Sequence, residues 1–212
     1  MSAGDILSRT FALVRLVPVP AALAFVLMTA VGMLIDSATV MGGGADALNL
    51  FLSCLILVLQ FWIVRALLED LRLPLPERPR FSVFFLAGIV TTLGIMLGLV
   101  LLILPGIVLF VRWSLTVPII LGGDRGVFDS IGDSWRATSG SSWPIFLVWA
   151  AIYGPGTANA ALGLFPSMVA DPMLGAAIFN LGFNAALIVG WYASVAIYVR
   201  LLGPATIMRV FD

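Results

Sequence analysis

Long apolar runs dominate this 212-residue chain, and short segments between them hold nearly all of the charged residues. The runs are about as long as a helix needs to cross the ~30 Å hydrocarbon core of a bilayer at 1.5 Å per residue. The pattern predicts an all-α, polytopic integral membrane protein whose single domain covers 1–212. Its six transmembrane helices are expected near 17–35, 48–64, 81–104, 106–121, 143–165 and 176–199.

The first 16 residues have a different pattern from the spans. Ile6, Leu7, Phe11 and Val14 recur at helical spacing between charged residues, which predicts an amphipathic helix near 3–16 on the membrane surface. Ser2 stands where an N-cap would start this helix. A frayed terminus is the alternative interpretation.

A second amphipathic helix is predicted near 126–139. Val127, Phe128, Ile131 and Trp135 would form its apolar face, and Gly140 is a candidate for its C-terminal stop. These two segments complete the expected architecture of six spans and two interfacial helices.

The stretch 81–121 is too long for one crossing and contains one charge, Arg112. Pro105 lacks a backbone donor and breaks helices, and Gly106 permits a tight reversal. We therefore expect Leu104, Pro105 and Gly106 to form the tip of a hairpin between the third and fourth spans. A further interruption is expected in the fifth span at Gly154-Pro155-Gly156, as a kink or a partial unwinding.

Composition and charge agree with a membrane protein. Hydrophobic residues make up 61% of the chain and charged residues only 10%, whereas soluble domains carry about 25% charged residues. All the basic residues are arginines, and ten of the eleven fall at the N-terminus, at the C-terminus or in alternate loops. The loops at 36–47 and 166–175 contain acids only. By the positive-inside rule both termini are predicted to be cytoplasmic.

The sequence lacks the side chains that most catalytic schemes need. It has no histidine, one cysteine (Cys54) in an apolar run, no pair of acids within a predicted span, and no nucleotide-binding or hydrolase motif. We expect no enzymatic activity, no cofactor, no metal and no nucleic-acid partner.

Arg112 is the residue most indicative of function, because a charge inside the bilayer core is costly and usually marks a pair, a pathway or a ligand. Asn180, Asn184, Tyr153 or backbone carbonyls near Gly154 are candidate neighbours. Arg112 is expected either to anchor those carbonyls or to bind a lipid head group or another anion.

Small residues in two of the predicted spans favour close helix packing. Gly94 and Gly98 lie one turn apart in the third span, and Asn180 and Asn184 do so in the sixth. Helices that meet at small residues and are joined by amide hydrogen bonds are common in membranes. The alternative is that the two asparagines line a polar cavity.

The region from Leu101 to Trp143 resembles an uncharacterised bacterial membrane-protein superfamily, which includes YciC-like proteins and the membrane domain of some glycerophosphodiester phosphodiesterases. The matching residues are Leu104, Pro105, Gly106, Arg112, Trp113, Pro118, Ile131, Ser134, Trp135, Thr138 and Gly140. Gly123 stands where the family usually has an acid, although Asp124 follows it. The phosphodiesterase domain of some relatives has no counterpart here.

Together these observations predict a non-enzymatic, multi-pass protein of the bacterial cytoplasmic (inner) membrane. Lipid handling, membrane integrity or the assembly of membrane complexes is its expected role. Membrane phospholipids are the expected partners, with other membrane proteins or a second copy of the chain as further candidates. The alternative is a transporter or channel with its site around Arg112 and the interrupted fifth span.

Overall fold

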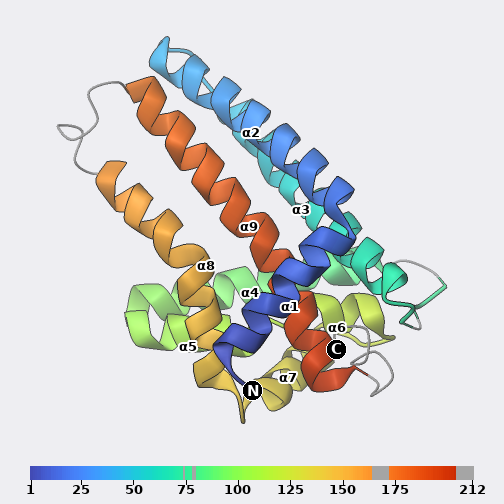
Figure 1. The fold of residues 1–212 in the computed structure, drawn as a ribbon. Helices are drawn as coiled ribbons and strands as arrows, with labels where there is room; N and C mark the ends of the chain where they lie inside the picture. The colour runs from blue at the N-terminus through green and yellow to red at the C-terminus, as the bar shows by residue number, and fades with distance from the viewer. Residues whose placement is uncertain (74, 78–79, 164–171, 204–212) are drawn as a thin grey trace.

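The computed structural model describes the chain except residues 74, 78–79, 164–171 and 204–212, and gives the backbone alone at 40, 156–163 and 172. The described part is helical, as predicted, with no strand among these residues (Figure 1). The helices are α1 (Ala3–Leu16), α2 (Pro18–Val40), α3 (Asp46–Asp70), α4 (Phe81–Leu101), α5 (Ile103–Trp113), α6 (Thr116–Gly122), α7 (Val127–Thr138), α8 (Ser142–Gly163) and α9 (Pro172–Leu202).

The long helices α2, α3 and α9 contact one another, and α8 packs against α9. Figure 1 shows these four running lengthwise, whereas α4 and α5 lie across the lower half of the molecule. The core is concentrated where the two sets meet, and Leu67, Ile120 and Tyr192 are fully buried there. The Tyr192 hydroxyl donates to the carbonyl of Val17 at 2.6 Å, which fixes α9 to the junction of α1 and α2.

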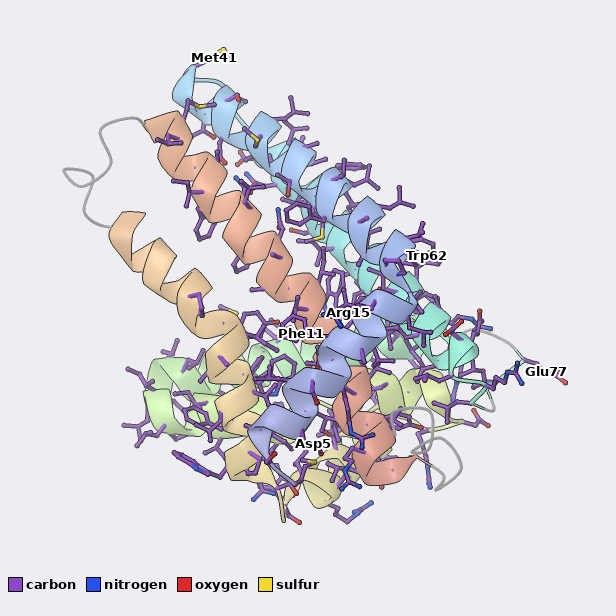
Figure 2. The ribbon with its side chains drawn as sticks, viewed as in Figure 1. Asp5, Phe11, Arg15, Met41, Trp62 and Glu77 are labelled. Atoms are coloured by element: carbon purple, nitrogen blue, oxygen red, sulfur yellow. The ribbon has the colours of Figure 1, made fainter. Side chains whose placement is uncertain are left out.

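Residues Ala3–Leu16 form helix α1 where a helix was predicted, so the frayed-terminus alternative is wrong. The hydroxyl of Ser2 caps it by accepting the N–H of Asp5 at 3.1 Å. The predicted apolar face is only partly correct, because Thr10 and Leu13 are buried with Ile6. Phe11 is 52% exposed, and Figure 2 shows it on the outside of the bundle. The helix therefore packs on α8 and α9 and still offers apolar surface outward.

The ends of the described chain lie on one side of the molecule. Asp5 near the start of α1 pairs with Arg200 near the end of α9 at 3.6 Å. Arg80, just before α4, pairs with Asp124, just after α6. Figure 2 places Met41, between α2 and α3, at the opposite end from Asp5. The first and last residues of the stretch from α4 to α6 therefore lie close together.

The hairpin between α4 and α5 is present, but its turn was predicted at the wrong residues. The break is at Leu102, which alone is extended, with φ −158° and ψ 129°. Pro105 and Gly106 lie in the first turn of α5, where the missing N–H of a proline costs no helix hydrogen bond. The interruption therefore comes three residues earlier than Pro105.

Small residues bring the two arms of this hairpin together. A Cβ added to Gly98 would lie 2.9 Å from the Cα of Gly106, and one added to Gly94 would meet the ring of Trp113. The predicted role of Gly94 and Gly98 in close helix packing is therefore confirmed.

Several predicted boundaries change. Helix α2 extends to Val40 and α3 begins at Asp46, so most of the loop expected at 36–47 is helical. Helix α8 continues through Pro155 to Gly163. The unwinding expected there is absent, because the residues on both sides keep helical hydrogen bonding.

Candidate functional site

A break between α5 and α6 organises the candidate site, and it was not expected from the sequence. Helix α5 ends at Trp113 and α6 starts at Thr116. The hydroxyl of Ser134, on α7, accepts the N–H of Leu115 at 3.1 Å and donates to the carbonyl of Arg112 at 2.7 Å. The Ser134 hydroxyl thus binds one backbone N–H and one backbone carbonyl, and the break leaves both without helical partners.

Helix α7 presents hydroxyl groups to the protein and apolar side chains outward. Ser130, Ser134 and Thr138 are its buried residues, whereas Phe128 is 76% and Trp135 41% exposed. The sequence correctly placed an apolar face here, but the inward face is the hydroxyl stripe. Phe128 and Trp135 are exposed beside the charged Asp129 and Arg136, an arrangement that suits a helix at the interface between lipid and water.

The side chain of Arg112 lies beside this break. Its guanidinium carbon is 5.1 Å from the centre of the Trp135 ring, and Nη1 donates a long 3.5 Å hydrogen bond to the carbonyl of Trp135. Among the described carboxylates, none pairs with Arg112. An aromatic face and a carbonyl lower the energy of a cation without cancelling its charge. The site therefore has positive charge available for an anion.

A groove of about 370 Å³ runs from Arg112 along α5 toward the hairpin turn. It is lined by Leu104, Ile107, Val108, Val111 and Arg112 of α5 and by Ser142, Trp143 and Phe146 of α8. Its polar groups, Arg112 and Ser142, are at the end near α7, and the N-terminus of α8 adds a positive dipole there. The remaining lining is apolar or aromatic, so the groove joins a cationic end to an apolar channel.

The other residues predicted to accompany Arg112 are elsewhere. Asn180 donates to the carboxylate of Asp36, and Asn184 donates to the hydroxyl of Thr29 at 3.3 Å, so both connect α9 to α2. Tyr153 stacks on Trp149 and meets Phe110 edge to face. None of the three lines the groove.

The residues that carry the sequence resemblance mostly meet at the hairpin and the break. Leu104 lines the groove, Pro105 and Gly106 start α5, and Trp113 packs against Gly94. The others are the buried Pro118 of α6, the break-capping Ser134, the Arg112-stacked Trp135, and Gly140 in the turn after α7. Ser134 was matched as a motif residue, but only the structure shows what it binds.

Asp36 lies in helix α2, not in the loop predicted at 36–47. Because α2 continues to Val40, Asp36 is a helical residue on the side that meets α9. Its partner Asn180 also donates to the carbonyl of Ala176 at 3.1 Å. The residues after Ile35 are compatible with a helix, so the sequence allowed α2 to continue, but the acidic side chain of Asp36 suggested a loop.

This pair gives a stability prediction. Asn180→Leu removes the amide that serves the Asp36 carboxylate, and we expect a loss of about 1–3 kcal/mol in unfolding free energy. The double variant Asp36→Leu, Asn180→Leu should recover most of the loss, because both polar groups are then gone. Unfolding in mixed micelles measures both effects. A double variant no more stable than Asn180→Leu would contradict this account.

Among the described residues, no group of three or more histidine, cysteine or acidic side chains is placed to hold a metal ion. Five helical stretches in the part searched are long and apolar enough to cross a membrane, and the chain has the properties of a multi-pass, all-helical membrane protein. Comparisons with protein-family models, with curated proteins and with solved structures found no match. The resemblance noted for 101–143 therefore stays a prediction.

Proposed function

We propose that this chain is a non-enzymatic membrane protein that binds an anionic phospholipid in the groove between α5 and α8. The observation that carries the proposal is Arg112, a cation with no carboxylate partner among the described residues, at the polar end of an apolar channel. Lipid handling, or lipid-dependent assembly or integrity of the membrane, is the role that such binding would serve.

The groove matches one phospholipid in its chemistry. A phosphate accepts paired hydrogen bonds from a guanidinium, and the start of α8 favours the same negative charge. From Arg112 to Leu104 the channel follows α5 for about 12 Å, which gives room for part of one acyl chain. Trp143, 68% exposed at the polar end, suits the membrane interface. A head group at Arg112 and an acyl chain along α5 would therefore occupy one leaflet.

We further propose that the groove opens to the inner leaflet of the bacterial cytoplasmic membrane, with both termini in the cytoplasm. Asp5 and Arg200 are adjacent, which requires an even number of crossings between them. The arginines of alternate loops support the cytoplasmic side. Helices α2, α3, α8 and α9 are assigned as four crossings, an even number, and the stretch 81–121 begins and ends on one side whether or not it crosses.

Lipid retention by Arg112 variants tests the proposed function. We expect Arg112→Leu to lower the amount of phosphatidylglycerol retained after purification by about 10-fold or more, because charged hydrogen bonds contribute roughly 1.5–3 kcal/mol. Arg112→Lys should retain an intermediate amount, since it keeps the charge without the paired geometry. Native mass spectrometry of protein from phosphatidylcholine–phosphatidylglycerol vesicles measures the retention.

Arg65→Leu is the matched control, because Arg65 already pairs with Glu69 at 2.8 Å on another helix. It should retain the wild-type amount of lipid. Equal retention by wild type and a folded Arg112→Leu protein would refute the lipid site. A large loss of thermal stability in Arg112→Leu would instead support the structural-anchor alternative, since a groove ligand does not need Arg112 for folding.

A further inference from the structure

No polar side chain occurs in the turn between α4 and α5 or in the residues that flank it on either side. From Leu93 to Val111 every residue is aliphatic, aromatic, methionine, glycine or proline. The tip is also the most exposed apolar part of the described chain, with five consecutive residues uncovered. Their exposed fractions are 81% for Val100, 69% for Leu101, 68% for Leu102, 69% for Ile103 and 75% for Leu104.

Two backbone hydrogen bonds connect the residues of this turn to the helices on either side. The N–H of Leu102 donates to the carbonyl of Gly98 at 3.0 Å, and the N–H of Gly106 donates to the carbonyl of Leu102 at 3.4 Å. Pro105 has no N–H, so one of the donors that a helix start leaves free does not exist here. A one-residue turn adds no further loop backbone to the free groups of the two helix ends, which is the least unfavourable way to reverse direction in hydrocarbon.

Helix α4, with 21 residues, is long enough for one crossing, but the short α5 and the direction of the hairpin do not suit two crossings. Helix α5 has 11 residues, about 16 Å, before the break that Ser134 caps. Figure 1 shows the pale green hairpin crossing the long helices in the lower half, far from the end where α2 joins α3. Arg80 before α4 pairs with Asp124 after α6, so this stretch begins and ends on one side, as both a re-entrant hairpin and a pair of crossings require.

We propose that α4 and α5 form a re-entrant hairpin whose tip ends among the acyl chains and never reaches the opposite aqueous face. The occupant of the exposed tip is lipid hydrocarbon. An aqueous tip would expose five large apolar side chains in a row with no polar residue beside them, whereas in hydrocarbon the same surface is solvated favourably. The hairpin thus replaces the two full crossings predicted for 81–121 and inserts into the leaflet on the side of the termini.

Depth measurements on spin-labelled cysteines test this inference. In a Cys54→Ala background reconstituted into phosphatidylcholine–phosphatidylglycerol vesicles, Leu102→Cys and Val100→Cys should show high collision rates with oxygen and low rates with a water-soluble nickel complex. Val58→Cys on α3, 51% exposed within a predicted span, is the lipid reference. Met41→Cys, 81% exposed at the far end, is the water reference. An impermeant thiol reagent should modify the cysteine at 41 but neither hairpin cysteine.

Two results would overturn the inference. Nickel collision at position 102 equal to that at position 41 would place the tip in water and restore two crossings. Low collision with both probes would mean that protein, such as a second copy of the chain, covers the tip. The depth does not depend on the lipid site, so Arg112→Leu should leave it unchanged. Failure of either proposal is thereby distinguishable from failure of the other.

Discussion

Ser134→Ala should destabilise the protein by about 2–3 kcal/mol, a large fraction of the 5–15 kcal/mol that keeps a typical domain folded. The substitution removes one hydroxyl, but two backbone groups lose a partner. These are the N–H of Leu115 and the carbonyl of Arg112, at the point where α5 stops and α6 begins. Leu115 is fully buried, so water cannot replace the lost partner without opening the core.

Ser139→Ala is the matched control on the next turn of the chain. The hydroxyl of Ser139 donates only to the carbonyl of Arg136, at an exposed position, and its loss should cost less than about 0.5 kcal/mol. Thermal unfolding in detergent, followed by tryptophan fluorescence, compares the two variants. If Ser134→Ala and Ser139→Ala have the same melting temperature, the break is not held by Ser134.

The sequence predicted the class of fold well because hydrophobic length is a strong signal in membranes. A bilayer leaves few backbone solutions, so an apolar run of span length can be assigned to a helix from the chain alone. Helix α1 was also predicted, because its N-cap and its mixed face are local features. Tertiary contacts are needed to see that Thr10 is buried and Phe11 exposed.

Proline was a misleading guide to the hairpin turn. Pro105 ends a helix only if it lies in the interior, and at the third residue of α5 it is compatible with helix. The position of the turn depends instead on Gly98 and Gly106, which must face each other for the arms to pack. The sequence indicated both glycines but not their register, because many pairings of small residues are possible.

The candidate site was predicted in part. Arg112 was singled out as a charge without a nearby acid, and no described carboxylate pairs with it. Other arginines do form such pairs, namely Arg9, Arg65, Arg80, Arg125, Arg136 and Arg200. Asn180, Asn184 and Tyr153 were predicted to lie beside Arg112, and none of them does. For Asn180 the reason is that Asp36 was assigned to a loop, so it was not considered as a partner. The break after Trp113 could not be predicted, since a hydroxyl from α7 stabilises it from outside the segment.

The break and the groove are linked through α7. Ser134 and Trp135 are consecutive, so the hydroxyl that holds the backbone at Arg112 and the ring that holds its side chain come from one helical turn. The position of the guanidinium therefore depends on the seating of α7. Since Phe128 and Trp135 expose apolar surface on α7, its contact with the membrane surface is expected to influence the site.

Gly98→Ala should destabilise the hairpin by about 1–3 kcal/mol even though alanine favours helix over glycine by up to about 1 kcal/mol. The new methyl would lie 2.9 Å from the Cα and 3.0 Å from the N of Gly106, and backbone atoms cannot move aside as a flexible side chain can. Gly98→Leu should have the larger effect and separate α4 from α5.

Gly88→Ala on the same helix is the control, because a Cβ there has nothing within 4 Å. It should be neutral or slightly stabilising, so the two alanine variants should shift the melting temperature in opposite directions or by clearly different amounts. A spin label pair at Met96 and Val108, both exposed residues of the two arms, reports the separation directly. Unchanged distances and stability in Gly98→Leu would mean that the arms do not pack through Gly98 and Gly106.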